Sequence, residues 1–335
     1  MGDIDFVVMW VDGNDPAWQT ERNNYLSPDV AQDGCSANRF RDWGLMKYWF
    51  RSVEKFAPWV HKVYFVTWGH TPEFLNLDAE KLVVVKHEDF MPEEYLPTFS
   101  ANPIELNLHR IPGVSSQFVL FNDDMLLTRP VQPETFFKNN LPCAYYAEIP
   151  FVPSLDMGVF QPILFNDISV LNRNFDKGNT YKQNYKKYYD PCYLLKDKLR
   201  TFILHRINPD SFSAFKNFHC PAAYLKSTYE TVWDKEFDVL NKTSSEKFRS
   251  DHDVNQYIML WWQLLSGQFA PSKIDNKLYS ISDKSVDDII NNIIHQTSDM
   301  ICINDGDINA DLDMLSKQIQ HAFEIILPEK SSFEL

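Results

Sequence analysis

The sequence lacks the glycine-rich and cysteine-rich motifs that identify several common classes of protein. Neither G-x-G-x-x-G nor G-x-x-x-x-G-K-[ST] occurs, which excludes a dinucleotide fingerprint and a Walker-type phosphate loop. The five cysteines are widely separated and form no C-x-x-C pair, as expected in a reducing cytosol. No apolar run reaches 18 residues and no signal-type region opens the chain, so we expect neither a membrane span nor a secretory leader.

Positive charge is also scarce. The formal net charge is -14, which argues against a nucleic-acid binder, because such a protein needs a basic surface to neutralise phosphates. Hydrophobic residues make up 44% of the 335 positions and aromatic residues 15%, so the chain is globular. We expect one large domain or two intimately packed ones.

An apolar run at residues 118–124, Phe-Val-Leu-Phe-Asn-Asp-Asp, ends on two acids, Asp123 and Asp124. Open α/β sheets build ligand sites at the carboxyl ends of buried strands. Carboxylates repel phosphate unless a cation bridges them, and Mg²⁺ is held by one or two carboxylates plus phosphate oxygens. The run therefore indicates a metal-assisted phosphate enzyme, although a polar turn would use the same residues.

Strand-like and helix-like patterns alternate through the first half of the chain. Apolar runs predict strands at 5–11, 63–67 and 82–85, and helical spacing predicts helices at 39–56 and after Ser100. The pattern predicts an α/β fold with a Rossmann-like, mostly parallel sheet and helices on both faces, plus a helical C-terminal part. We divide the chain into a nucleotide-binding-like half, 1–131, and a less regular half, 132–335.

The second half contains a basic, tyrosine-rich segment at about 177–206. Its lysines and arginines alternate with tyrosines, which suits either an anionic glycan ligand or a solvated helix with its tyrosines in the core. A second helix is predicted to begin after residues 250–255 and to stop at Gly267, and a last amphipathic helix covers 312–326.

Several sequence words resemble the Stealth family. The first and second family regions are represented by 5–16, 39–43, 51–59, 97–105, 108–113 and 121–124, the third by His219-Cys-Pro221, and the fourth by 248–255. The resemblance implies a glycosyltransferase-A-like fold and transfer of a sugar 1-phosphate from a UDP-sugar to a glycan hydroxyl, with release of UMP. It also implies Mg²⁺ or Mn²⁺, a bacterial cytoplasmic enzyme of capsule or cell-wall polymer synthesis, and a glycan or phosphoglycan acceptor. Lipid linkage of that acceptor, and peripheral membrane association at the inner face, stay open.

Ten residues become candidates for this chemistry. Metal ligands are Asp123, Asp124 and Asp253; nucleotide or ligand contacts are Asp15, Asn122, Arg39 and Asn255; catalytic residues are His219, Arg249 and Asp12. The imidazole of His219 titrates near neutral pH and suits a general base, and a guanidinium clamps phosphate bidentately.

Structural roles would also explain some of these residues. His219 would then be a satisfied structural histidine and Asp253 a helix cap. Arg39, Arg41, Arg51, Glu105, His109 and Arg110 fall in family words but also suit salt bridges between helices and sheet. Two rival functions remain: a metal-dependent glycosyltransferase that releases UDP, and a non-catalytic glycan-binding protein.

Overall fold

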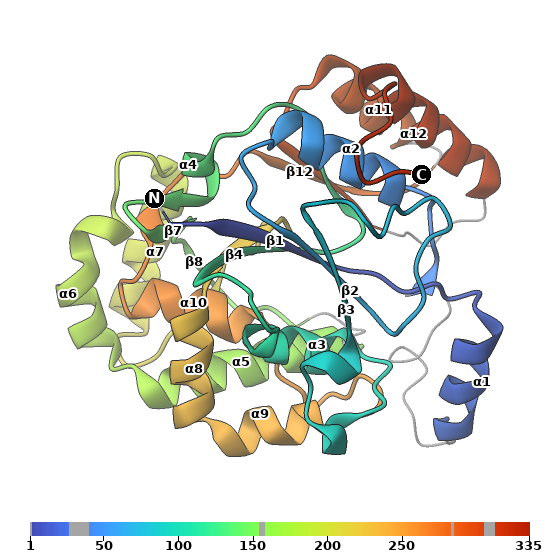
Figure 1. Cartoon of the computed structure of the whole chain (residues 1–335). Coiled ribbons are helices and arrows are strands. Elements are labelled where there is room, and N and C mark those ends of the chain that lie inside the picture. Colours follow the sequence, from blue (N-terminus) through green and yellow to red (C-terminus); the bar gives the residue numbers. More distant parts are fainter. Residues whose placement is uncertain (1, 27–39, 154–157, 283–284, 305–311) are drawn as a thin grey trace.

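The computed structural model describes residues 2–26, 40–153, 158–282, 285–304 and 312–335. A five-stranded sheet lies at its centre in the order β10-β4-β1-β2-β3, with β10 antiparallel to the four parallel strands. Figure 1 shows helices above and below this sheet. The predicted α/β class and mostly parallel sheet are therefore confirmed. The central strands are β1 (Ile4–Met9), β2 (Val63–Thr67), β3 (Leu82–Lys86), β4 (Gln117–Phe121) and β10 (Ala222–Leu225).

Smaller sheets flank the central one and join distant parts of the chain. They contain β5 (Met125–Leu127), β6 (Phe137–Lys138), β7 (Leu141–Ala144), β8 (Glu148–Ile149), β9 (Ala214–Phe215), β11 (Ala270–Pro271), β12 (Asn276–Ser280) and β13 (Met300–Asn304). Because β10 pairs with β4 and β13 pairs with β5, the second half contributes strands directly beside the first. The division at residue 131 stays a prediction.

Helices cover both faces of the central sheet. The α-helices of the described chain are α1 (Pro16–Tyr25), α2 (Met46–Phe56), α3 (Ala101–Asn107), α4 (Pro133–Phe136), α5 (Phe160–Asn174), α6 (Lys177–Tyr188), α7 (Leu195–Ile207), α8 (Lys226–Lys235), α9 (Phe237–Ser244), α10 (Tyr257–Leu265), α11 (Val286–His295) and α12 (Leu312–Ile326). None of the described helices is long and apolar enough to cross a membrane.

Alternation along β1 divides the core in two. Phe6 and Val8 join the cluster beneath α2, α11 and α12, whereas Val7 joins the cluster with α3, α8 and α10. Both clusters are fully buried at these positions. The sheet is therefore covered on both faces, which explains why its strands are continuous apolar runs.

The predicted helix at 39–56 begins later than its spacing suggests. Its first regular residue is Met46, because Gly44 takes a left-handed conformation with φ +66° and its N–H donates to Asp42 Oδ1 at 2.7 Å. Asp42 therefore lies outside the helix. The helix predicted after Ser100 and the last amphipathic helix are confirmed as α3 and α12.

The basic, tyrosine-rich segment forms α6 and α7. Tyr181 and Tyr188 are buried, as the structural interpretation requires, but Tyr185 is 60% exposed and does not face the core. Lys177 is wholly buried and its Nζ lies 2.6 Å from Glu148 Oε1. Lys187 Nζ donates to the Phe269 carbonyl at 2.8 Å. These two lysines therefore hold the fold together.

Candidate active site

The acids predicted at the end of β4 lie in the turn that leads into β5. Met125 N–H donates to the Asn122 carbonyl at 3.1 Å, and Ile303 N–H of β13 donates to the Asp124 carbonyl at 2.9 Å, which fixes the turn. Asn122 Oδ1 and Asp124 Oδ1 are buried and have no hydrogen-bond partner. Such oxygens normally have a partner, so these two atoms are available as hard oxygen ligands for a cation.

Negative charge accumulates around Asp123. Burial, followed by the charges of Asp124 and Asp42, raises the pKa of Asp123 to about 8. Asp42 in turn lies near Asp12, which follows β1. Burial and the charge of Asp12 raise the pKa of Asp42. A divalent cation would offset this repulsion, so the donor set fits Mg²⁺ or Mn²⁺.

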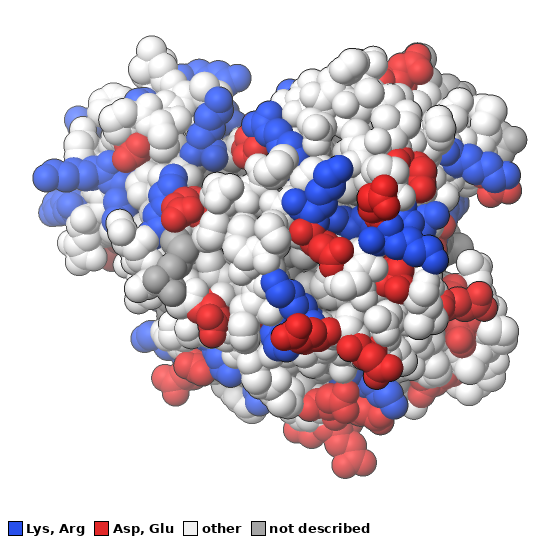
Figure 2. Space-filling view, turned by 45° about the horizontal axis from the view of Figure 1, so that its top comes forward, with Lys and Arg blue, Asp and Glu red and all other residues white. Residues whose placement is uncertain are grey.

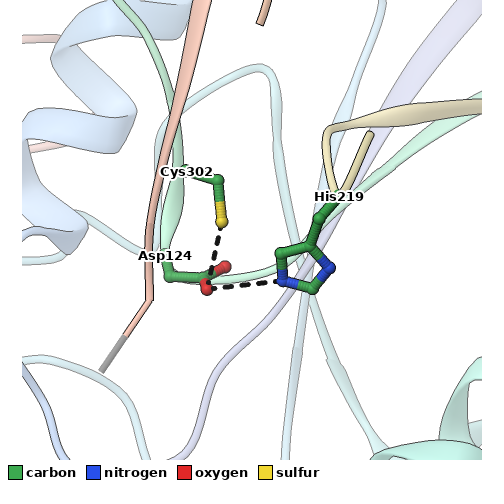
Figure 3. Close-up of side chains that lie close together, drawn as sticks. All are labelled: Asp124, His219 and Cys302. Carbon is green, nitrogen blue, oxygen red and sulfur yellow. Dashed lines mark hydrogen bonds and ion pairs between the residues drawn. The ribbon is translucent and has the colours of Figure 1, made fainter. Parts of the chain in front are cut away.

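Asp124 lies beside two side chains from distant parts of the sequence (Figure 3). Its Oδ2 atom is 3.9 Å from His219 Nε2 and 3.3 Å from Cys302 Sγ. Among the described parts of the chain, these are the only three His, Cys, Asp or Glu residues whose ligand atoms all lie within 4.8 Å of one another. Asp124 and His219 are 23% and 25% exposed, so a ligand can reach both.

His219 is held firmly at the edge of this site. Its Nδ1 is 3.3 Å from the Tyr257 hydroxyl and its Nε2 is 3.2 Å from Asn304 Oδ1. The backbone is left-handed there, with φ +43°, and its N–H donates to Asn217 Oδ1 at 2.8 Å. Strained backbone of this kind persists where surrounding bonds impose it, and it is common at functional sites.

The electrostatic setting of His219 favours its protonated form. Burial lowers its pKa, but the hydrogen bond and the charge of Asp124, together with Asn304, raise it above the ordinary value. Cys302 behaves differently, because burial and the neighbouring Asp124 raise the pKa of its thiol far above the usual range. The thiol is therefore a hydrogen-bond donor to Asp124, and a thiolate ligand is disfavoured.

Asp12 and Asp15 follow β1 at the same edge of the sheet, because β1 and β4 are parallel neighbours. Asp15 caps α1 by accepting the Trp18 N–H at 2.8 Å, and its other oxygen lies 3.6 Å from His70 Nδ1. Its predicted nucleotide contact stays a prediction, but the carboxylate already has structural partners. Asp12 N–H donates to His70 Nε2 at 2.8 Å, which positions Asp12 near Asp42.

Arg249 lies near two buried carboxyls, Glu105 and Asp253, and its charge lowers the pKa of both. Burial raises the pKa of Glu105, while the charges of Arg249 and His219 lower it, so both predicted catalytic residues act on this buried carboxyl. Burial likewise raises the pKa of Asp253 to about 6. Asp253 Oδ2 accepts from Asn102 Nδ2 at 2.8 Å and from the Ser250 N–H at 3.1 Å.

The structure does not bring Asp253 into one ligand set with Asp123 and Asp124. Its metal role stays a prediction without geometric support, and its side chain does not cap α10. The capping position of α10 is Gln256, and Asn255 Oδ1 accepts the Tyr257 N–H of its first residue at 2.9 Å. Arg39, a predicted nucleotide contact, lies outside the described residues.

Other residues of the family words have structural partners. Arg51 pairs with Glu334 at 2.8 Å, the guanidinium of Arg110 lies 4.7 Å from the Trp233 ring centre, and His109 packs against Tyr229. The structural alternative is therefore confirmed for Arg51.

Sequence reasoning did not single out Asp42, Cys302, Asn304 or Tyr257 as site residues. Only Asp42 carried a signal, because it lies in the family word at 39–43.

Known proteins resemble this chain along its whole length. The Stealth conserved region 1 matches residues 2–27, and conserved region 2 matches residues 39–144. A capsular polysaccharide phosphotransferase, WcwK of Streptococcus pneumoniae, is 40% identical over 100% of this chain and 98% of its own. The chain belongs to the Stealth family. Its resemblance to the third and fourth family regions stays a prediction.

Other polysaccharide phosphotransferases are similar to this chain over nearly its whole length. A receptor polysaccharide phosphotransferase, WefC of Streptococcus oralis, is 41% identical over the full length of both chains. An exopolysaccharide phosphotransferase, cps2G of Lactiplantibacillus plantarum, is 38% identical over 99% of this chain and 96% of its own. Mouse xyloside xylosyltransferase 1 has a TM-score of 0.34 at 12% identity, covering 90% of this chain and 98% of its own, which is too distant to inform the chemistry of the site.

Proposed function

We propose that this Stealth protein transfers a sugar 1-phosphate from a UDP-sugar to a hydroxyl of an acceptor glycan, forming a phosphodiester and releasing UMP. The observation that carries the proposal is the carboxylate-rich turn after β4 with His219 directly beside it. Relatives named as phosphotransferases of capsular, receptor and exopolysaccharides support phosphate transfer in polymer synthesis.

The donor would bind at the carboxyl ends of β1 and β4. Asp123 and Asp124 would hold Mg²⁺ or Mn²⁺, which neutralises charge on the pyrophosphate when bound. The unpartnered oxygens Asn122 Oδ1 and Asp124 Oδ1 support this assignment. Asp12 lies at the same edge, and Arg249 would clamp a phosphate oxygen with its planar guanidinium.

His219 would accept the proton of the acceptor hydroxyl as that oxygen attacks phosphorus. Asp124 strengthens the imidazole as a base, because it raises the pKa of His219 and stabilises the imidazolium that forms. Tyr257 at Nδ1 orients the ring. A bond forms between the acceptor oxygen and the transferred phosphorus. The bond between that phosphorus and the oxygen that bridges the two phosphates breaks, and UMP leaves with the bridging oxygen.

The leaving nucleotide tests the reaction type. Purified protein is incubated with UDP-sugars, Mg²⁺ and acceptor glycan, and the released nucleotide is separated by anion exchange. UMP is expected, whereas UDP would identify a glycosyltransferase and end the proposal. A protein that binds glycan but releases neither nucleotide would be a binding protein.

His219→Ala tests the proton acceptor separately. We expect nearly unchanged UDP-sugar binding and a loss of roughly 10²–10⁴-fold in kcat. His321→Ala, an exposed histidine on α12, is the matched control and should behave as wild type. Wild-type kcat in His219→Ala would remove the histidine from the mechanism but leave the reaction type standing.

We also propose a cytoplasmic location. Four cysteines of the described chain, Cys143, Cys192, Cys220 and Cys302, are free thiols, as a reducing compartment preserves them.

A further inference from the structure

Helix α7 has its polar side inward and its apolar side outward. Asp197, Thr201 and Leu204, at the spacing of one helix face, are buried. Leu195 and Leu199 on the opposite side are 79% and 57% exposed, and Ile207 at the end of the helix is 71% exposed. This is the reverse of the usual surface helix, whose apolar stripe faces the core.

The apolar surface is concentrated in one place. Of the 17 large hydrophobic side chains that are exposed in the described chain, six lie between residues 194 and 207. They are Leu194, Leu195, Leu199, Phe202, Ile203 and Ile207. Scattered exposed leucines are ordinary, but a continuous apolar helix face marks an interaction surface.

Hydrogen bonds on the inner side prevent α7 from turning this face inward. Asp197 Oδ2 accepts from the Tyr145 hydroxyl at 2.8 Å and from Lys216 Nζ at 3.1 Å. Thr201 Oγ1 accepts the Glu148 N–H at 3.0 Å, and Arg200 Nε donates to the Glu148 carbonyl at 3.1 Å. Rotation of the helix would break all of these bonds, so the outward apolar face is built into the fold.

The segment that contains this exposed face is positively charged, in an otherwise acidic protein. Residues 177–207 contain eight lysines and arginines and two aspartates, so eight minus two gives a formal charge of +6, against -14 for the whole chain. Lys182 and Lys186 of α6, and Lys196 and Arg206 of α7, are exposed. Figure 2 shows lysine and arginine side chains gathered on the left, where Figure 1 places α6 and α7, and acidic side chains gathered along the lower edge.

We propose that α7 docks on an anionic lipid bilayer, with its apolar face inserted at the headgroup level and the surrounding lysines and arginines on the lipid phosphates. A single outward helix with a basic border matches the form of interfacial membrane helices. A second copy of the chain fits less well, because a twofold interface pairs a surface with itself and would bring the two basic borders together. The inference is independent of the reaction proposed for the active site.

Flotation with lipid vesicles tests the proposal on the full chain. Wild type should float with vesicles of mixed phosphatidylcholine and phosphatidylglycerol, less with phosphatidylcholine alone, and less at high salt. The variant Leu195→Ser, Leu199→Ser, Ile207→Ser should lose roughly tenfold or more of its vesicle binding. The control Leu77→Ser, Phe237→Ser, Ile325→Ser removes side chains that are 58%, 54% and 51% exposed elsewhere, and should float as wild type.

The role of the positive charge is tested by two triple variants. The first is Lys182→Glu, Lys186→Glu, Lys196→Glu, and its control is Lys273→Glu, Lys277→Glu, Lys317→Glu. All six lysines are exposed. Only the first set should weaken binding to anionic vesicles. Wild type that does not float, or an α7 variant that floats equally well, would overturn the proposal. A wild-type dimer that the α7 variant dissociates, with no flotation, would overturn it too and identify a protein interface.

Discussion

Asp124 accepts a hydrogen bond from the Cys302 thiol through Oδ2, at 3.3 Å, and leaves Oδ1 without a partner. One carboxylate therefore has an oxygen fixed by the protein and an oxygen available to a ligand. The thiol remains protonated because burial and Asp124 raise its pKa. Cys302 thus orients Asp124, and the cation would bind hard oxygen atoms.

A change at Cys302 separates these roles. Cys302→Ser keeps a donor and should retain metal preference and most activity, whereas Cys302→Ala should cost about 1 kcal/mol, roughly fivefold in kcat/KM. The measurement is steady-state kinetics with Mg²⁺, Mn²⁺ and Zn²⁺. If Cys302→Ser abolished a Zn²⁺-supported activity of the wild type, the thiolate would be a metal ligand and this assignment would be wrong.

Removal of the cation ligand should stop turnover. EDTA should abolish activity, and Asp124→Asn should raise the barrier by about 3 kcal/mol or more, over ~10² in kcat/KM, because phosphoryl transfer depends on charge neutralisation. Circular dichroism should show an intact fold. Asp313→Asn on the exposed side of α12 is the control. Full activity of Asp124→Asn in chelator would exclude the metal role.

Metal binding should release a proton from Asp123. Its pKa in the metal-free protein is about 8, against 3.8 for an ordinary aspartate, so the protonated form prevails at neutral pH and must be displaced. Apparent affinity should rise about tenfold per pH unit below pH 8. Calorimetry in buffers of different ionisation enthalpy measures the release, and Asp123→Asn should eliminate it.

In the metal-free protein, the raised pKa of Asp123 makes the fold less stable as pH rises. A raised carboxyl pKa favours the neutral group in the folded state, so the contribution of Asp123 to the free energy of unfolding falls as pH rises from 3.8 to about 8. Metal affinity that does not change across this pH range would contradict the shift and the proposed ligand together.

The C-terminal ion pair should control stability without affecting chemistry. Arg51 and Glu334 are 7% and 4% exposed and 2.8 Å apart, so Glu334→Gln removes the buried negative charge and leaves Glu324 as the carboxylate that pairs with the guanidinium. We expect a loss of about 3 kcal/mol in urea unfolding. The exposed control Glu329→Gln should lose almost nothing.

Acid should remove the same contribution. Arg51 and the Ser331 N–H oppose the effect of burial and lower the pKa of Glu334 below 4.5. Its stabilisation is therefore complete above pH 4.5 and is lost as pH falls through the lowered value. The difference in free energy of unfolding between wild type and Glu334→Gln should therefore shrink as pH falls through this window, and a variant that unfolds like wild type at pH 7 would show that the pair contributes nothing.

Sequence alone predicted the parts of the site that depend on local pattern. The run at 118–124 indicated a buried strand ending in Asp123 and Asp124, and the alternation of elements predicted the parallel sheet. Cys302 and Asn304 were beyond such reasoning, because they reach Asp124 only through the antiparallel register of β13 on β5, with Cys302 opposite Met125. That pairing joins segments almost 180 residues apart.

The other surprises have similar causes. Asp42 lies in the site because Gly44 interrupts the predicted helix, so that α2 begins only at Met46. The periodicity of the sequence did not show this interruption. Arg51 was expected to suit a salt bridge, but its partner could not be named from the sequence, because Glu334 lies near the other end of the chain. The structural interpretation of the tyrosine-rich segment placed its tyrosines in the core, but Tyr185 is 60% exposed, and the outward apolar side of α7 was not predicted.

Phosphorus in the product tests the central claim most directly. Wild-type enzyme, UDP-sugar, Mg²⁺ and acceptor glycan are incubated, the glycan is purified away from nucleotides, and its ³¹P NMR spectrum is recorded. The account predicts a phosphodiester resonance in the glycan, which is absent when His219→Ala replaces the wild type for the same time. A glycan that has gained sugar but contains no phosphorus would contradict sugar 1-phosphate transfer.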